Sequence, residues 1–389
     1  MTLEARTSPG CTVDFNHVTG AAYLADPPGE WDRIRAAGPI VRSDQLGGYW
    51  IVTDPALVRE VLADVELFSN RQLVIPAMAG GQPMVPAELD PPEHPKYRRL
   101  VVGPFTPHAV GRMSDGISHI VTSLLDRIKP GSEIDFCAEF AQPLPALVFT
   151  GLCALPDGDS AQFLDWVELL THGETPEQRN QAALTLRAFL RAEIVRRRGT
   201  DGTDLLTRIA NSQVDGQPVD LQMAENMAFL LTLGGLDTTT GFLSLTWRYL
   251  ASHPVARHDL TRDGESVAAG LEELLRVFGN ANPVRYVTRD VHWHGVDLRE
   301  GDLLLVGLTP ANRSPGSSPR IGGAEPPCPH IAFGVGHHRC IGLHLARREV
   351  AIAIKLWHDR FPDYHFTGDE LRYSGGGVFA IRELRLQLD

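Results

Sequence analysis

The chain has 389 residues, with 36 Lys and Arg against 48 Asp and Glu, so its formal net charge is −12. Such an acidic chain lacks the basic surface that binds phosphate groups, which argues against a nucleic-acid partner. Hydrophobic residues make up 43% and charged residues 22% of the chain, a composition that is typical of a soluble globular protein. Five scattered cysteines do not make a disulfide framework, so we expect a reducing, cytoplasmic location.

The N-terminal part of the chain predicts a flexible start followed by short elements. Residues 1–20 carry no basic stretch before an apolar one, so we expect no signal peptide. Residues 49–52 predict a strand. Asp54 followed by Pro55 predicts the start of a helix that reaches Leu62, because Asp caps helix N-termini and Pro fits the first turn. Residues 71–90 are rich in Gly, Pro and Met and are predicted to form a mobile lid.

The middle of the chain is predicted to be helical. Thr175 to Gln178 form a capping box that predicts a helix running toward Arg198. Residues 211–220 are predicted to form a turn between helices. The apolar stretch 227–250 is interrupted by two glycines and an aspartate, so it predicts a buried helix and no membrane span.

The C-terminal third contains the clearest β-pattern. Residues 291–306 predict a hairpin-like pair of strands around Gly295 and Gly301. Residues 310–330 hold six prolines and three glycines within 21 residues, too many for a helix. Because hydrophobic patterning resumes on both sides of each loop, residues 1–389 are predicted to form a single, mainly α domain with a small β-region.

Residues 331–347 carry the most informative pattern. Gly334 and Gly336 permit backbone angles that other residues avoid. Apolar positions recur at helical spacing after Cys340, which places this cysteine at or just before a helix start, where a thiolate is favoured. An inert buried thiol, a zinc site and a thiolate ligand to haem iron are the three interpretations. The zinc site would use Cys328, His337, Cys340 and His344.

A resemblance favours the haem interpretation. The pattern Phe333-Gly334-x-Gly336-x-His338-x-Cys340-x-Gly342 resembles the haem-binding signature of the cytochrome P-450 superfamily. The resemblance implies the family's triangular, mainly α haem domain. It also implies haem b as the cofactor, Cys340 as the axial ligand of its iron, and dioxygen as co-substrate. Phe333 and Gly334 would belong to the haem-binding loop.

Residues 230–241 lie in a predicted helix that is apolar nearly all round, where an aspartate is costly unless it is solvated or paired. Alone, this stretch fits a bent core helix whose threonine hydroxyls bond to its own carbonyls. It is also similar to the family's central helix, most closely to that of the camphor-hydroxylating bacterial member. The resemblance implies a distorted turn beside the iron. Asp237 would relay protons, and the Thr238 hydroxyl would hold the reduced-oxygen intermediate and its water.

Glu273 and Arg276 are spaced i, i+3 on a predicted helix, which usually gives an exposed pair of little energetic weight. The pair is similar to the family's E-x-x-R element, a buried structural pair that supports the haem loop. Residues 312–328 lack the Phe and Asp residues of the family's usual meander. This departure leaves the third partner of the pair open.

Haem propionates need cationic or hydrogen-bonding partners. His94 and Arg98 alone would be a surface charge cluster, but their spacing resembles the family's H-x-x-x-R helix start. The resemblance implies that His94, Arg98, Arg285 and His338 serve the propionates.

The implied substrate pocket is mostly aliphatic, which predicts a small or medium lipophilic substrate of terpenoid or aromatic-like type. The loop 74–87 would contribute to it, and its lack of tyrosine does not support camphor. The other implied pocket residues are Leu230, Leu233, Ala281, Val284, Val378 and Phe379.

The chain contains no G-x-G-x-x-G fingerprint, so electrons from NAD(P)H are expected to arrive through a separate ferredoxin and its reductase. Five basic residues have two interpretations, either a docking patch for the ferredoxin or simply solvated helix faces. They are Arg99, Arg339, Arg347, Arg348 and Lys355. We expect a monomeric haem-thiolate monooxygenase. Two alternatives are peroxide-driven oxidation or oxidative coupling at the same haem site, and a non-catalytic haem sensor.

Overall fold

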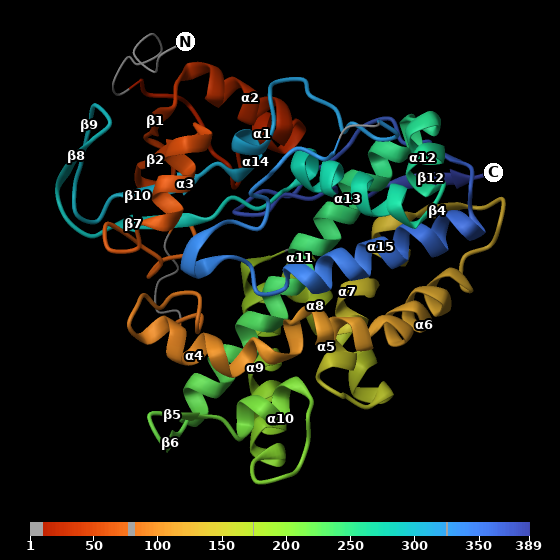
Figure 1. Cartoon of the computed structure of the whole chain (residues 1–389), viewed down its shortest axis with the longest axis horizontal. Helices are drawn as coiled ribbons and strands as arrows, with labels where there is room; N and C mark the ends of the chain where they lie inside the picture. Colours follow the sequence, from red (N-terminus) through yellow and green to blue (C-terminus); the bar gives the residue numbers. More distant parts are fainter. Residues whose placement is uncertain (1–10, 77–81, 174, 324–325) are drawn as a thin grey trace. The chain divides into compact units, whose positions relative to one another are not determined.

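The computed structural model describes residues 11–76, 82–173, 175–323 and 326–389, and Figure 1 shows the order of their elements. Contacts within the chain group into two compact units. Unit 1 comprises residues 1–81, 241–340 and 363–389, and unit 2 comprises residues 82–240 and 341–362. The start of the predicted flexible N-terminus and residues 77–81 of the predicted lid lie outside the described residues.

Unit 2 is almost entirely helical among its described residues. Its helices are α4 (Glu93–Val101), α5 (Pro107–Arg112), α6 (Ser114–Leu125), α7 (Pro143–Leu152), α8 (Asp157–His172), α9 (Pro176–Arg197), α10 (Leu205–Ala210) and α15 (Leu343–Arg360), with a 3-10 turn, η3 (Gly103–Phe105), and a π-helical turn, η4 (Cys137–Ala141). Its short strands are β4 (Glu133–Asp135), β5 (Gln213–Val214) and β6 (Gln217–Pro218).

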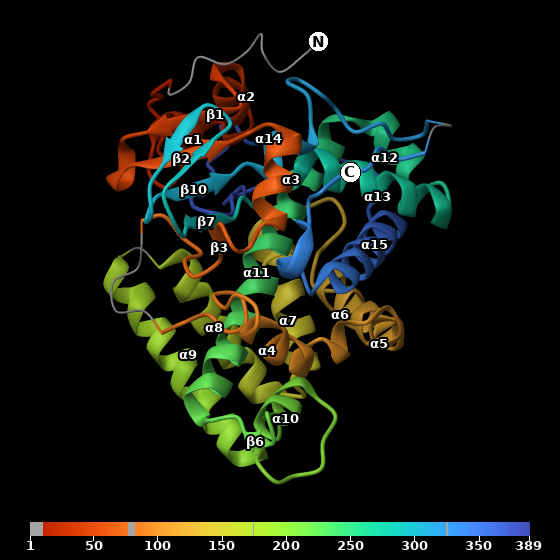
Figure 2. The same cartoon turned by 60° about the vertical axis from the view of Figure 1, so that its left-hand side comes forward.

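Helix α15 packs against α6 and α5, and the three helices lie side by side in both views (Figures 1 and 2). Val350, Ala353, Ile354 and Trp357 recur at i, i+3, i+4 and i+7, so they form one apolar face and are all buried. The aromatic rings of Phe136 and Phe140 meet the Trp357 ring edge-on, each with 5.0 Å between ring centroids. These contacts fix the helix that follows the cysteine loop in the sequence.

Two predictions for unit 2 are confirmed. The predicted capping box begins α9, because Thr175 Oγ1 accepts from the Gln178 N–H while the Gln178 side chain accepts from the Thr175 N–H. The predicted turn at 211–220 is the β5–β6 hairpin, in which Asp215 and Gly216 take left-handed backbone angles of φ 51° and 79°.

Unit 1 combines short helices with a mixed sheet. Its helices are α1 (Ala21–Ala25), α2 (Pro27–Ala37), α3 (Pro55–Ala63), α12 (Pro254–Thr261), α13 (Gly264–Phe278) and α14 (Leu308–Asn312), with 3-10 turns η2 (Gln45–Gly47) and η5 (Gly336–His338). Its strands are β1 (Ile40–Ser43), β2 (Tyr49–Val52), β3 (Phe68–Ser69), β7 (Val284–Val287), β8 (Val291–Trp293), β9 (Val296–Leu298), β10 (Leu303–Val306), β11 (Tyr364–Phe366) and β12 (Arg385–Leu388).

The main sheet of unit 1 has the order β1-β2-β10-β7-β3, with β10 parallel to β2 and antiparallel to β7. The predicted strand at 49–52 is β2, and the predicted helix after Asp54 is α3, capped by the Asp54 side chain. The predicted hairpin at 291–306 is only half correct. Strands β8 and β9 form a hairpin, whereas β10 joins the main sheet because its residues 304–306 are fully apolar and buried.

Apart from its first three residues, which complete α14, the described parts of the stretch 310–330 (310–323 and 326–330) are irregular, as predicted. The prediction that this stretch contains no helix is therefore wrong at its start, where Leu308 and Thr309 begin the helix ahead of Pro310. Proline is compatible with the first turn of a helix because its missing N–H has no helical partner there.

The predicted buried helix at 227–250 is confirmed as α11 (Leu221–Ser252), whose residues belong to unit 2 up to Thr240 and to unit 1 from Gly241. The helix is continuous through Gly234 and Gly235, so the expected distorted turn is not seen as a break in the described backbone. Among the described residues, α11 alone is long and apolar enough to span a membrane, and most of that stretch is buried. The fold is mainly α with small sheets, as predicted.

Candidate active site

The loop that carries Cys340 is held by short-range backbone bonds in unit 1. The N–H of Gly334 donates to the Ile331 carbonyl at 2.8 Å, and the N–H of Cys340 donates to the Phe333 carbonyl at 2.9 Å. Gly334 and Gly336 both have left-handed backbone angles, φ 66° and 74°, which glycine adopts without steric cost. The loop therefore closes on itself and ends at the thiol, three residues before α15 begins at Leu343.

Gly336 also allows the loop to approach α3. A Cβ atom at this position would lie 2.9 Å from the Leu62 carbonyl oxygen, which is closer than such atoms normally come. At Gly334 the same atom would meet nothing within 4 Å. The two glycines thus serve different ends, since Gly334 supplies only a backbone angle and Gly336 supplies an angle and a close contact.

Glu273 and Arg276 form a buried ion pair on α13, with 2.7 Å between Arg276 Nη2 and Glu273 Oε2. The third partner, left open by the sequence, is Arg320, whose backbone N–H donates to Glu273 Oε2 at 3.2 Å. The Cys328 N–H donates to the other carboxylate oxygen at 2.9 Å. Burial alone would raise the pKa of Glu273, but the bonds from Arg276, Cys328 and Arg320 lower it to about 2. The pair therefore ties α13 to the irregular segment that precedes the cysteine loop.

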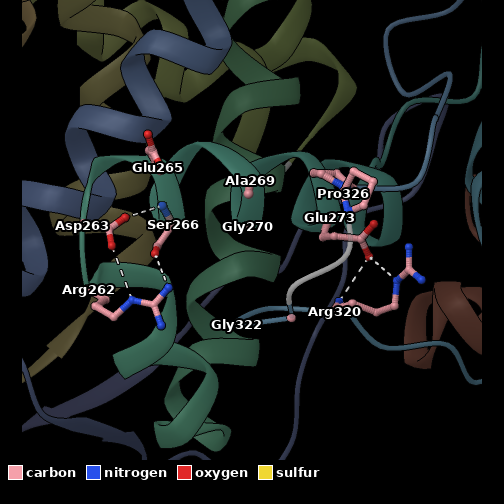
Figure 3. A pocket seen from close by; sticks show the side chains of 12 residues that line it. Arg262, Asp263, Glu265, Ser266, Ala269, Gly270, Glu273, Arg320, Gly322 and Pro326 are labelled. Atoms are coloured by element: carbon pink, nitrogen blue, oxygen red, sulfur yellow. Dashed lines mark hydrogen bonds and ion pairs between the residues drawn. The ribbon is translucent and has the colours of Figure 1, made fainter.

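Figure 3 shows a pocket beside this pair, between the first turns of α13 and the segment around Gly322. Glu273 and Arg320 lie at one end, and Asp263 caps α13 at the other by accepting from the Ser266 N–H at 2.7 Å. The lining contains none of the residues assigned to catalysis or cofactor binding by the sequence. The pocket is lined by Arg262, Asp263, Glu265, Ser266, Ala269, Gly270, Glu273, Arg320, Gly322, Gly323, Pro326 and Pro327.

Unit 1 also carries two of the expected propionate partners. Arg285 lies on β7 and is buried, and its Nη1 donates to the Val284 carbonyl at 2.8 Å. His338 closes the 3-10 turn η5, two residues before Cys340.

The other two expected propionate partners lie on α4 in unit 2. His94 and Arg98 are one helical turn apart, so they share a face of the helix. His94 is buried, with only 1% of its surface exposed, and Arg98 is partly buried. The helix therefore presents an imidazole and a guanidinium together, and the interpretation of these residues as a surface charge cluster does not fit the buried histidine.

Asp237 and Thr238 lie on α11 in unit 2. Asp237 is exposed, Thr238 is partly exposed, and Leu230 and Leu233 are partly buried on the preceding turns. Thr238 Oγ1 donates to the Gly234 carbonyl at 3.0 Å, which is the back-bonding expected of a helical threonine. The Thr238 hydroxyl thus makes the bond that is expected of a core helix. The Asp237 side chain on the same turn is nevertheless exposed.

Unit 1 brings the remaining expected pocket residues together. Ala281 and Val378 form an antiparallel β-bridge, and Asn280 Nδ2 donates to the Phe379 carbonyl at 2.9 Å. Val284 and Phe379 are fully buried. Residues 77–81 of the expected pocket loop lie outside the described residues.

Two buried residues were missed by the sequence reasoning. Glu349 on α15 is 3% exposed, and burial raises the pKa of its carboxyl to about 8. Its burial could have been predicted from its position between Ala346 and Ala353 on the apolar face of the helix. Thr240 on α11 donates from Oγ1 to the Ala141 carbonyl at 3.1 Å, and no local sequence pattern points to that partner.

The residues present fit a haem. A single thiol stands at the end of a glycine loop, as a thiolate ligand to iron requires. Buried or partly buried imidazole and guanidinium groups at His94, Arg98 and Arg285 are suited to two propionates. Among the described residues, no three His, Cys, Asp or Glu side chains have the geometry of a metal site, so the zinc interpretation finds no support.

Comparison with known proteins agrees with this fit. No family model matches the chain. The chain is 31% identical over 353 residues to the probable cytochrome P450 127A1 of Sinorhizobium fredii, covering 87% of this chain and 83% of that protein. It is 29% identical over 353 residues to the vitamin D(3) 25-hydroxylase of Pseudonocardia autotrophica, covering 87% of each. The crystal structure of cytochrome P450 CYP101C1 matches with a TM-score of 0.89, 27% identity and 97% coverage of both chains. With its cysteine loop and this degree of likeness over most of its length, the chain belongs to the cytochrome P450 superfamily of haem-dependent monooxygenases.

Proposed function

We propose that this cytochrome P450 oxidises a small or medium lipophilic molecule, with Cys340 as the axial ligand of the haem iron and with Asp237 and Thr238 delivering protons. The observation that carries the proposal is the cysteine loop, in which the Cys340 N–H closes onto the Phe333 carbonyl at 2.9 Å. An inert buried thiol would need neither the closed loop nor the close approach of Gly336 to α3.

The cofactor is haem b, which when bound supplies the iron that activates dioxygen for insertion of oxygen into a substrate C–H bond. The Cys340 thiolate would donate electron density to the iron. The propionates would be held by cationic and hydrogen-bonding side chains, which would offset their two charges. These side chains are His94, Arg98, Arg285 and His338.

The proton path uses the exposed side of α11. Asp237 lies on this side, where its carboxylate can relay protons. The hydroxyl proton of Thr238 is engaged by the Gly234 carbonyl at 3.0 Å, which orients Oγ1 to accept a hydrogen bond from a water molecule. Asp237 therefore supplies the proton, and Thr238 fixes the water that carries it.

The substrate class follows from the side chains assigned to the pocket. Leu230 and Leu233 on α11, and Ala281 and Val378 in unit 1, are aliphatic and partly buried. Such a lining favours a terpenoid or an aromatic-like molecule. The relative named vitamin D(3) 25-hydroxylase carries the name of an apolar substrate, which supports the same class. A spectral binding screen tests this, and the proposal fails if only highly charged ligands shift the haem spectrum.

Electrons reach the haem from NAD(P)H through a separate acidic ferredoxin and its reductase, with the protein acting as a cytoplasmic monomer. Arg347 and Arg348 lie on α15, and Arg348 is exposed. Reversal of both charges to Glu should slow reduction by ferredoxin at low salt. The difference should shrink at high salt, where charges are screened. Unchanged reduction kinetics at low salt would contradict this docking surface.

Thr238→Ala tests the proton path in haem-loaded protein. Without the hydroxyl, substrate binding and NADH consumption should continue, while product formed per NADH falls and hydrogen peroxide accumulates. Thr238→Ser keeps the hydroxyl and is the matched control, which should stay well coupled. If Thr238 only bends a core helix, Thr238→Ala should lose haem content but remain coupled. Tight coupling in Thr238→Ala would remove this residue from the mechanism.

A further inference from the structure

The Ala141 carbonyl lacks the donor that an α-helix would supply. It stands at the end of the π-helical turn η4, where the Gln142 N–H reaches back five residues to the Cys137 carbonyl at 3.0 Å. The residue four positions beyond Ala141 is Pro145, which has no N–H. Ala141 is fully buried, and a buried carbonyl without a partner is costly.

Thr240 on α11 supplies the missing hydrogen-bond donor to the Ala141 carbonyl. Its Oγ1 donates to the Ala141 carbonyl at 3.1 Å, across 99 residues of sequence, and Thr240 is 9% exposed. Other threonines of the same helix behave differently, since Thr232 bonds to the Ala228 carbonyl at 2.9 Å and Thr238 to that of Gly234. Helical threonines usually make such bonds within their own helix. The Thr240 hydroxyl instead joins α11 to the segment before α7, which lies beside it in both views (Figures 1 and 2).

The bond from Thr240 to the Ala141 carbonyl, called the anchor below, lies in the same turn of α11 as the residues proposed to deliver protons. Asp237 and Thr238 precede Thr240 by three and two residues, within a single turn of α11. At about 100° per residue, Thr238 and Thr240 point roughly 200° apart, to opposite sides of the helix. A bond on one side therefore limits how far the other side can rotate or move.

We propose that Thr240 is a positioning residue, which holds Asp237 and Thr238 in register for proton delivery by fastening the opposite side of their turn to the Ala141 carbonyl. The inference rests on the proposed function of Asp237 and Thr238. Thr240 touches neither substrate nor cofactor in this role. It acts through the helix backbone, so its loss changes the position of the turn rather than its chemistry.

Thr240→Val and Thr240→Ser separate the hydroxyl from the side-chain volume. Valine has nearly the same shape but cannot donate, and serine keeps the donor. Hydrogen–deuterium exchange in haem-loaded protein should show amides of residues 238–244 exchanging roughly tenfold faster in Thr240→Val, since a buried carbonyl loses its partner. Product formed per NADH should fall at least twofold, and Thr240→Ser should restore both values. Thr232→Val is the control, because it removes a buried hydroxyl that bonds only within α11.

The outcomes are distinct. Unchanged exchange in Thr240→Val would show that the bond does not hold the turn and would overturn the inference. Faster exchange with tight coupling would show an anchor that does not position the proton path, which also overturns it. Equal uncoupling in Thr232→Val would mean that any buried hydroxyl of α11 has this effect, and would also overturn the inference. If Thr238→Ala itself stays tightly coupled, the proposed function fails, and the inference falls with it for that separate reason.

Discussion

The loop around Cys340 and the turn of α11 around Asp237 hold their functional groups by different means. The loop is fixed by bonds that span three and seven residues, from Gly334 to Ile331 and from Cys340 to Phe333. The turn is an ordinary piece of helix, and its anchor through Thr240 reaches a carbonyl 99 residues away. The position of Cys340 is thus set by bonds within its own loop, whereas the turn with Asp237 and Thr238 is tied to a distant segment.

Replacing Cys340 by His should have the largest effect on the loop. The carbon monoxide difference band from which the family takes its name requires a thiolate ligand, so this variant should lose the band completely in haem-loaded protein. Cys328→Ser is the matched control, because Cys328 is also partly exposed and lies twelve residues earlier. A Cys340→His protein that kept the band would assign the iron to another cysteine.

Replacing Asp237 by Asn should have the largest effect on the helix turn. An amide cannot relay a proton as a carboxylate does, so turnover should fall by about 10²–10⁴-fold, the range typical of positioned acid–base groups. The measurement is the rate of product formation under saturating substrate and redox partners. Asp237→Glu keeps the carboxylate and should retain more activity. Equal rates in all three proteins would take the carboxylate out of the proton path.

The same contrast between local and distant contacts explains which features could be predicted from the sequence and which could not. The caps at Asp54 and Thr175, and the helix start after Cys340, depend on neighbouring residues and were predicted correctly. The pairing of β10 with β2 and the bond between Arg320 and Glu273 join distant segments. No local pattern encodes such partners, so they could not be predicted.

For the candidate site, the sequence predicted which residues to look for, but their surroundings only in part. The burial of His94 distinguishes it from the surface cluster that its charged neighbours indicated. The helix around Gly234 was predicted, but its unbroken course was not, because the family resemblance implied a distorted turn there and two adjacent glycines lower helix propensity. For His94, burial within the fold decided the outcome.

Glu349 should give a pH-dependent stability that neither functional region explains. Burial raises the pKa of this carboxyl from 4.5 to about 8, so the folded protein keeps a proton that the unfolded chain has lost. The free energy of unfolding should therefore fall as pH rises from 4.5 toward 8, by up to about 1.4 kcal/mol per pH unit. Glu349→Gln should remove this slope in denaturant titrations.

His17 provides the control for the Glu349 measurement, because its slope has the opposite sign. Burial lowers its pKa from 6.5 to about 4, so the unfolded chain binds a proton that the folded protein excludes. Stability should fall as pH drops below 6.5, equally in wild type and Glu349→Gln. An unchanged slope above pH 5 in the Glu349→Gln variant would contradict the assigned pKa.

Replacing the two loop glycines by alanine should give the smallest effects. The two variants separate the cost of backbone strain from the cost of a steric collision. Gly334→Ala introduces only backbone strain, which costs about 1 kcal/mol at a left-handed angle. Gly336→Ala adds the collision with the Leu62 carbonyl and should cost about 2–3 kcal/mol. Chemical denaturation of both variants measures the difference. Equal losses would mean that α3 moves aside without cost.

The mixed sheet of unit 1 has a consequence for how the chain folds as it is synthesised. Strand β2 pairs with β10, so Trp50 cannot pair with its neighbour Leu304 until most of the chain has left the ribosome. Unit 1 is also assembled from three separate pieces, the last of which ends at residue 389, whereas most of unit 2 is the continuous segment 82–240. Pairing across so much sequence is slow and leaves strand edges exposed in the meantime. Nascent chains that stop before residue 306 should therefore expose the edge of β2 and depend on chaperones, while unit 2 can begin to fold much earlier.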